Sequence, residues 1–581
     1  MKKTILLLCC ATACATAQTT HGSMFPAVRG THHMVGAGNN LEVAAGTRIL
    51  EQGGNAVDAA VATALAAAIT ELDHFGMGGE MPMLIKLVGK PVVAISGVGV
   101  APKMATPEYF AQRGGKPPIP GDGILAATVP GVFDGLILAL QKYGTMSFAQ
   151  VSAPALEYAE QGFPTTEIFA SYLHNTRKVY SQWPTSVAFF LPGGKEPVPG
   201  EIFREPDMAR TLRELVAAEK KSHGKREKKL QAVRDYFYQG KLAHKIADFS
   251  EANGGLIRYD DLKSYHAEID TPRTTTYRGF EIDKPGFWTQ GPVMLEALNI
   301  LEGYDLKAMG HNSPEYLHVV IEAAKLAFAD RDRYYGDPKF SKIPEEILLS
   351  KEYAAERRKL IDPKKASMES RPGTFAPPVP LPSSTTTSGN SDTTCVNVVD
   401  SKGNIVSATP SGAWLPSVIV GDTGIPLGTR LQTLLTTPGH PNTLAPGKRP
   451  RVTLSPTIVL KDGKTYMVMS TPGGDNQDQA MLQVLLNIID FGMTPQQAVE
   501  SPRFQTEHFH SSFANHEFIA GKLNLEDRFP VATIEALRSI GHIVNVTGPW
   551  SNASAPTVIR TSGPVLEGAA DPRRGRFVFG R

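Results

Sequence analysis

The order of apolar and polar residues predicts two helices close to the start of the chain. Between residues 41 and 52, apolar residues recur at helical spacing: Leu41, Ala44, Ala45 and Ile49. Gly53-Gly54 ends this segment, and Asn55 can cap an alanine-rich helix from Ala56 to about Thr70. Because alanine faces allow close packing, we expect this helix pair to lie in the interior.

Further segments alternate between the strand pattern and the helical pattern. Strand pairs are expected at residues 82–88 with 91–98, 393–399 with 405–409, and 455–460 with 465–470. Helices are expected at residues 131–143, 153–161, 208–215, 314–335 and 482–491. The run of Lys, Arg and Glu at residues 219–229 is typical of a solvated helix face, not of a nucleic-acid patch.

One segment departs from both patterns. Residues 362–392 contain Pro-Gly, Pro-Pro and a Thr triplet, with almost no large apolar residue after Phe375. This composition predicts an exposed linker that is easily cut. The linker runs directly into Thr393-Thr394 at the start of a predicted strand.

Composition and charge exclude several classes of protein. The chain has 581 residues, 41% of them hydrophobic and 20% charged, which is enough apolar material for a packed core. The length could fill roughly four domains, and one large interleaved fold is equally compatible with it. A net charge of +2 provides no electrostatic basis for nucleic-acid binding, and no apolar run approaches the ~18 residues of a membrane helix.

The first residues have the form of a signal peptide. Met1-Lys2-Lys3 is a basic start, residues 4–13 are apolar, and Ala15-Thr16-Ala17 forms a small-residue cleavage site. We therefore expect residues 1–17 to be removed and the protein to be secreted, in a bacterial periplasm. A lipid anchor at Cys14 is a weaker alternative. Removal leaves Cys395 alone, so the mature chain can form no internal disulfide.

The junction at Thr393 suggests a specific chemistry. If the chain breaks between Asp392 and Thr393, Thr393 gains a free α-amine beside its hydroxyl. An α-amine has a pKa of about 7.7–8, so it can act as general base for the hydroxyl near neutral pH. The alternative is that Thr393 is simply a good strand former.

Motifs spread over the rest of the chain decide between these interpretations. The segments are Gln52–Ala60, Pro130-Gly131, Lys142-Tyr143-Gly144, Asn253-Gly254-Gly255-Leu256, Phe328-Ala329-Asp330-Arg331 with Tyr335-Gly336-Asp337-Pro338, Thr393-Thr394, Ser455-Pro456-Thr457-Ile458, Pro472-Gly473-Gly474 and Ala570-Asp571-Pro572-Arg573. In this order they resemble the γ-glutamyltransferase (γ-glutamyltranspeptidase) family of N-terminal nucleophile hydrolases. The resemblance covers nearly everything after the signal peptide.

The resemblance implies a fold and an active site. The fold would be α/β (α+β), a four-layer αββα sandwich, cleaved from one precursor into a large subunit (residues 18–392) and a small catalytic subunit (residues 393–581). Thr393 would attack an amide carbonyl and form an acyl-enzyme. By position, Gly473 and Gly474 would form the oxyanion hole and Ser411 would support the nucleophile, with Thr409 as a rival assignment.

Departures from the family concentrate at the positions that hold the glutamyl group. Where the family has an Arg for the α-carboxylate, this chain has Val98, and where it has an acid for the α-ammonium, it has Thr433. The remaining differences are Val452-Thr453 in place of a Ser-Ser pair and Ala413 in place of an Asn. Arg430 or Arg451 could offer a substitute cation. The loss of these charged groups bears directly on which acyl group the enzyme can bind, because a buried charge without a partner is costly.

Three functions follow. The default function is transfer or hydrolysis of γ-glutamyl amides such as glutathione. The second is that of an acylase of the same fold that acts on another acyl amide. The third is that of an uncleaved envelope protein that only binds a ligand. We expect a small-molecule amide or peptide as partner and no cofactor.

Other candidate sites are weaker. We expect no metal, because Glu507, His508 and His510 lack a third ligand at zinc spacing. Asn545 and Asn552 match the short glycosylation pattern, which carries little weight beside a bacterial type of signal peptide.

Overall fold

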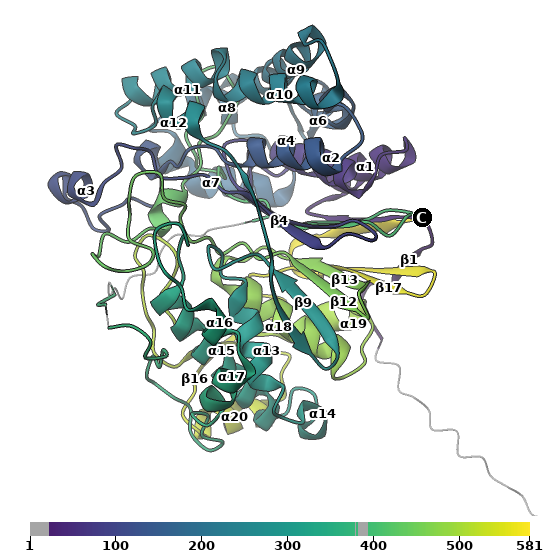
Figure 1. The fold of residues 1–581 in the computed structure, drawn as a ribbon, viewed down its shortest axis with the longest axis vertical. Coiled ribbons are helices and arrows are strands. Elements are labelled where there is room, and N and C mark those ends of the chain that lie inside the picture. The colour runs from purple at the N-terminus through teal and green to yellow at the C-terminus, as the bar shows by residue number, and fades with distance from the viewer. Residues whose placement is uncertain (1–21, 378, 382–392) are drawn as a thin grey trace, which may run out of the picture.

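The computed structural model describes residues 22–377, 379–381 and 393–581 (Figure 1). The expected signal peptide, Asp392 and the last part of the expected linker lie outside the described residues. The described part of the linker, residues 362–377 and 379–381, contains no helix or strand. No helix in the described part of the chain is both long enough and apolar enough to cross a membrane.

Two seven-stranded antiparallel sheets form the centre of the molecule. The first has the order β19-β2-β10-β11-β3-β4-β7 and the second the order β1-β18-β17-β13-β12-β9-β8. The first sheet consists of β19 (Phe577–Gly580), β2 (Met34–Ala37), β10 (Val396–Val399), β11 (Ile405–Ala408), β3 (Met81–Lys86), β4 (Val92–Gly97) and β7 (Glu268–Asp270). The second consists of β1 (Val28–Gly30), β18 (Val565–Ala570), β17 (Thr557–Ser562), β13 (Lys464–Ser470), β12 (Thr457–Lys461), β9 (Phe280–Lys284) and β8 (Arg273–Tyr277).

The sheets pack face to face, and helices cover their outer faces (Figure 1). Between the sheets, Leu84 and Ile405 of the first meet Ile458 and Val468 of the second in one apolar cluster. Over the first sheet lie α1 (Asn40–Glu51), α2 (Ala56–Thr70) and α4 (Val132–Tyr143). Over the second lie α13 (Pro292–Leu301), α15 (Pro314–Tyr334), α18 (Gln477–Ile489) and α19 (Pro495–Glu500). The mixed α/β expectation is confirmed.

Smaller elements complete the molecule. The remaining helices are α3 (Pro107–Arg113), α5 (Phe148–Val151), α6 (Ala153–Gln161), α7 (Glu167–Tyr180), α8 (Pro184–Phe190), α9 (Pro206–Lys221), α10 (Arg226–Tyr238), α11 (Lys241–Ala252), α12 (Tyr259–Ser264), α14 (Leu306–Met309), α16 (Glu345–Leu348), α17 (Lys351–Arg358) and α20 (Val531–Ser539). The remaining strands are β5 (Phe163–Pro164), β6 (Ile202–Phe203), β14 (Phe504–Thr506), β15 (Lys522–Glu526) and β16 (Ile543–Thr547). Short 3₁₀ turns include η3 (Arg430–Thr433) and η4 (Gly474–Asn476).

The predicted helix pair is present and buried. Asn55 caps α2 in a reciprocal capping box with Asp58, and every residue of α2 is buried. A uniformly apolar helix of this kind belongs in an interior, where its small side chains let α1 pack closely. The pair thereby forms one wall behind β10, the strand that follows Thr393.

Two predictions need correction. The strand expected from residue 393 begins only at Val396, and Thr393 makes an isolated bridge to Ser411. Residues 219–229 are not one solvated face, because α9 ends at Lys221 and α10 starts at Arg226. Within this stretch Glu219 is buried, and its carboxylate accepts the backbone N–H groups of Phe148 and Ala149 at the start of α5.

Candidate active site

The hydroxyl groups of Thr393 and Ser411 lie next to each other. Their oxygens are 3.0 Å apart, and both residues are buried. Thr393 lies just before β10 and makes a β-bridge to Ser411, which lies just after β11. Thr409, the rival of Ser411, has no hydrogen-bond partner for its hydroxyl among the described residues. The geometry therefore brings Ser411 to the candidate nucleophile.

Arg430 is a second hydrogen-bond partner of the Ser411 hydroxyl. Its Nη2 donates to Ser411 Oγ at 2.7 Å, and its Nε pairs with Glu80. Because a guanidinium can only donate, Ser411 accepts from Arg430 and keeps its own O–H available for the Thr393 oxygen. The result is a chain of three polar groups ending at the Thr393 hydroxyl.

The Arg430–Glu80 pair is deeply buried. Both side chains are 1% exposed, and the guanidinium lies 4.9 Å from the centre of the Trp414 ring. Burial raises the pKa of Glu80, although the charge of Arg430 opposes this shift. Glu80 follows a Gly-rich turn that approaches Ser411 closely: a Cβ at Gly79 would lie 2.2 Å from the Ser411 carbonyl oxygen. That turn was the only signal in the sequence that could have identified Glu80.

A second ion pair lies against the backbone of Thr393. Arg576 Nη2 donates to the Thr393 carbonyl at 3.5 Å, and Nη1 pairs with Glu71. Burial would raise the pKa of Glu71, but the charge of Arg576 holds it below its usual value. Burial, together with the charge of Glu71, raises the pKa of neighbouring Glu42 well above its usual value. No sequence motif pointed to Arg576, which comes from the C-terminal end of the chain.

Gly473 and Gly474 follow β13 in a tight loop. Their φ angles are 117° and 55°, in the region that favours glycine. A Cβ at Gly473 would lie 2.2 Å from Ser554 Oγ. Close to this loop the two sheets touch, since Ser407 Oγ of β11 donates to the Met469 carbonyl of β13 at 3.1 Å.

Two positions of the expected glutamyl clamp lie in a buried apolar cluster instead. Val98 and Val452 pack together with Trp288 and Leu454 in one buried cluster. The Thr433 hydroxyl donates to the backbone carbonyl of Arg430 at 3.0 Å, within η3. Neither a cation for a carboxylate nor an acid for an ammonium stands at these positions.

Two more clamp positions are buried. Thr453 is fully buried, and in the described structure its hydroxyl has no hydrogen-bond partner. Ala413 has a φ of 54°, a conformation that Asn adopts far more readily than Ala. The backbone shape at this position is thus one that the family's Asn would suit.

Arg451 contacts a different hydroxyl group and lines one pocket together with Thr433. Its Nη2 donates to Ser512 Oγ at 3.0 Å, and Nη1 has no partner among the residues described. Burial and the charge of Arg331 lower the pKa of Arg451 to about 10. Of the two cations suggested by the sequence, Arg430 alone makes a direct contact with Ser411.

The three residues weighed as metal ligands do not share a site. His508 Nδ1 accepts the Gly521 N–H at 2.8 Å, and Nε2 lies 3.1 Å from the Glu369 carbonyl. Glu507 pairs with Lys522 at 2.7 Å. Both ring nitrogens of His508 are thus engaged by backbone groups.

The structure assembles a different cluster, which the sequence analysis missed. His318, Glu322 and His542 are buried with their potential ligand atoms within 4.8 Å of one another. The spacing of His318 and Glu322 by one helical turn was the available signal. Glu322 is already neutralised by Lys325 at 2.7 Å and Arg371 at 2.8 Å, and His318 Nδ1 is hydrogen-bonded to His542 Nε2 at 2.9 Å. These contacts explain the cluster without an ion.

Comparisons with known proteins cover nearly the whole chain. Residues 43–580 match the family described as Gamma-glutamyltranspeptidase. The glutathione hydrolase-like YwrD proenzyme of Bacillus subtilis (strain 168) is 35% identical over 95% of this chain and 98% of its own length. The acylase ACY 1 proenzyme of Pseudomonas sp. (strain SE83) is 34% identical over 89% of this chain and 88% of its own length.

A solved structure extends the comparison to three dimensions. The crystal structure of cephalosporin acylase from Bacillus halodurans superposes with a TM-score of 0.84 at 30% identity, over 97% of this chain and 98% of that chain. The sequence relatives are named as proenzymes, which implies that such chains are processed into subunits. The chain therefore belongs to the γ-glutamyltranspeptidase family and is an amide-cleaving enzyme of that family.

Proposed function

We propose that the protein cleaves itself between Asp392 and Thr393 and then hydrolyses or transfers an acyl group through a Thr393 acyl-enzyme. The observation that carries this proposal is the contact chain from Thr393 through Ser411 to the buried Arg430. The subunits would be residues 18–392 and 393–581, in an αββα sandwich of the N-terminal nucleophile hydrolase type. Residues 1–17 would direct export to a bacterial periplasm and then be removed.

Self-cleavage begins in the intact chain. The Thr393 hydroxyl attacks the Asp392 carbonyl carbon, and the acyl group moves from nitrogen to oxygen. Water then hydrolyses the ester, which releases the Asp392 carboxylate and leaves Thr393 with a free α-amine. Ser411, held by Arg430, donates to the Thr393 oxygen and stabilises negative charge as it develops there.

Turnover uses the same oxygen. The α-amine takes the hydroxyl proton as Thr393 attacks the substrate carbonyl, and the Gly473 and Gly474 N–H groups receive the oxyanion. The amide C–N bond breaks, the leaving nitrogen takes the proton from the ammonium, and an ester remains on Thr393. Water or an amine then attacks this ester and regenerates the hydroxyl.

We further propose that the acyl group lacks the zwitterion of a glutamyl donor. The apolar cluster of Val98, Val452, Trp288 and Leu454 supports this, because an α-carboxylate placed there would lose its hydration without an ion partner. Two carboxylates near the site are already ion-paired: Glu80 with Arg430, and Asp475 with Arg331. A γ-glutamyl donor is the second candidate, supported by the glutathione hydrolase-like relative.

Two measurements test the proposal. Intact-mass analysis of the purified protein should show two polypeptides divided before Thr393; a single uncleaved chain without acyl transfer would favour a binding protein. Specificity constants are then compared for γ-glutamyl, glutaryl and simple acyl anilides. A clear preference for the γ-glutamyl compound would overturn the assignment of the acyl group.

The pH profile tests the base. Since the α-amine must be neutral to act, acyl transfer should increase as pH rises through its pKa. Selective acetylation of the Thr393 amine should abolish turnover while the fold remains intact. Full activity after acetylation would contradict the proposed base.

A further inference from the structure

Other segments of the chain pack against the Gly473–Gly474 loop. Two consecutive residues with positive φ are glycines, which lose more conformational freedom on ordering than any other residue. Within the loop, the Asn476 N–H donates to the Gly473 carbonyl at 3.0 Å, and the Gln477 N–H donates to the Gly474 carbonyl. An oxyanion hole requires N–H groups that are fixed before the reaction, so contacts from outside the loop bear on its function.

Ser554 and Asn552 pack against the loop from a distant segment of the chain. Asn476 Nδ2 donates to Asn552 Oδ1 at 2.7 Å and to Ser554 Oγ at 3.1 Å. The Ser554 N–H donates to the same Asn552 oxygen at 3.1 Å. Asn552 therefore joins the loop to the segment that lies directly on Gly473, and all three side chains are buried.

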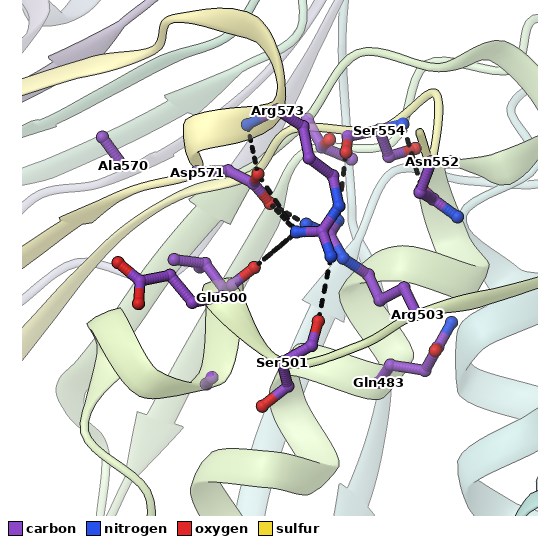
Figure 2. A network of polar contacts seen from close by, with 12 residues as sticks. Gln483, Glu500, Ser501, Arg503, Asn552, Ser554, Ala570, Asp571 and Arg573 are labelled. Carbon is purple, nitrogen blue, oxygen red and sulfur yellow. Dashed lines mark hydrogen bonds and ion pairs between the residues drawn. The ribbon is translucent and has the colours of Figure 1, made fainter. Parts of the chain in front are cut away.

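A buried ion network holds this segment in turn (Figure 2). Arg503 Nη1 donates to the Ser554 carbonyl at 3.1 Å, while Nη2 pairs with Asp571. Arg573 contacts Asp571 at 3.2 Å and Glu526 at 2.7 Å. The Glu526 carboxylate also accepts the backbone N–H groups of Asn552, at 3.3 Å, and of Arg503, at 3.2 Å.

We propose that Asn552 and Ser554 are positioning residues for the Gly473–Gly474 loop, braced by the network of Arg503, Asp571, Arg573 and Glu526. This inference rests on the proposed function, in which that loop receives the oxyanion. The network fixes the back of the loop so that its N–H groups stay aligned while charge develops. It also gives Asn552 a structural use in place of the glycosylation that its sequence pattern suggested.

The test compares Asn552→Ala with Asn552→Asp. The Ala variant removes the acceptor shared by Asn476 and Ser554, whereas Asp retains an oxygen for both donors. We expect Asn552→Ala to lower kcat 10- to 100-fold with KM within about twofold, and to weaken an acyl boronate that forms a tetrahedral adduct on Thr393 by the same factor. Asn552→Asp should retain most of the wild-type kcat and most of the wild-type affinity for the boronate.

Two controls separate positioning from stability. Asn524→Ala removes an amide of the same kind outside the network, where Asn524 contacts Glu507 and Asn545. Arg528→Gln removes an ion pair with Glu526 at the rim of the network and should lower the melting temperature with kcat near wild type. If Asn552→Ala does not fold, Ser554→Ala replaces it as the smaller truncation, with the same two readouts and a loss of several-fold expected.

The outcomes are distinguishable. A loss of kcat that merely follows melting temperature across all variants, or wild-type boronate affinity in Asn552→Ala, would overturn the positioning role. A wild-type protein that neither cleaves itself nor forms the boronate adduct would instead overturn the proposed function.

Discussion

The surroundings of Thr393 and the expected glutamyl clamp differ in how their polar groups are satisfied. Around Thr393, hydroxyls and charges form connected pairs: Ser411 with Arg430, Arg430 with Glu80, and Arg576 with the Thr393 carbonyl. At the clamp, Val98 and Val452 contribute only apolar surface. The two regions thus differ in their polar groups, and different segments of the chain supply them.

Removal of the nucleophile should have the largest effect. Thr393→Ala should remain a single chain and lose at least about 10³-fold in acyl transfer, as expected when the covalent step is lost. Thr409→Ala is the matched control, since its hydroxyl has no partner among the described residues. Mass analysis and anilide turnover measure both variants. A Thr393→Ala protein that still divides at this junction would show that another protease makes the cut.

Breaking the Arg430–Glu80 pair should have the next largest effect. Arg430→Met leaves a buried carboxylate without its partner, which costs about 3–5 kcal/mol of unfolding free energy. The double variant Arg430→Met/Glu80→Gln should recover most of that stability yet remain about 10- to 100-fold less active, because Ser411 has lost its donor. Denaturant unfolding and initial rates measure the two effects. Recovery of activity together with stability would mean that Arg430 only fills space.

A charge returned to the clamp should sharpen the contrast between the two regions. Thr433→Asp places an acid where the family receives an α-ammonium. The ratio of specificity constants for γ-glutamyl over glutaryl anilide should rise about tenfold, equivalent to ~1.4 kcal/mol. Thr433→Asn has the same shape without the charge and should leave the ratio unchanged. If this ratio is the same in Thr433→Asp and Thr433→Asn, the α-ammonium of the substrate does not bind beside residue 433.

Acid should weaken the network of Arg503, Asp571, Arg573 and Glu526 behind the Gly473–Gly474 loop. Burial alone would raise the pKa of Glu526, but Arg573 and Arg528 lower it to about 2. A depressed carboxyl pKa contributes stability above its unfolded value of about 4.3, and this contribution is lost as pH falls toward 2. We expect about 3 kcal/mol to disappear across that window, measured by urea unfolding. Glu526→Gln should be less stable at pH 7 and show a flatter dependence; an unchanged slope would refute the pairing.

Local pattern was sufficient for much of the fold. The helix pair α1 and α2, the hairpin of β10 and β11, and the hairpin of β12 and β13 were predicted because capping residues, turn glycines and apolar spacing act within a few residues. The strand expected at Thr393 was misplaced because Thr393 pairs only with Ser411, which also bridges Glu80 just before β3, and local propensity does not encode this pairing.

The residues of the candidate site also fall into two groups, those predicted from the sequence and those found only in the structure. Thr393, Ser411 and the Gly473-Gly474 pair follow from the sequence through the family resemblance, whereas Glu80, Arg576, Asn552 and Ser554 were not foreseen. Their partners lie far along the chain: Glu80 meets Arg430 across 350 positions, and Arg576 reaches Thr393 across 183. Spacing along the chain contains no information about such contacts.

The sequence by itself determined which residues stand at each position: Thr393 after a polar linker, and no charged group at the positions of the glutamyl clamp. From these residues and the family resemblance it predicts the cleavage site and the nucleophile. The tertiary structure decided what surrounds Thr393 and what surrounds the clamp positions. Val98 and Val452 become one apolar surface only when β4 and the segment before β12 meet. Arg430 acts on Ser411 only because both are buried beside Glu80, where an unpaired charge would be too costly to persist.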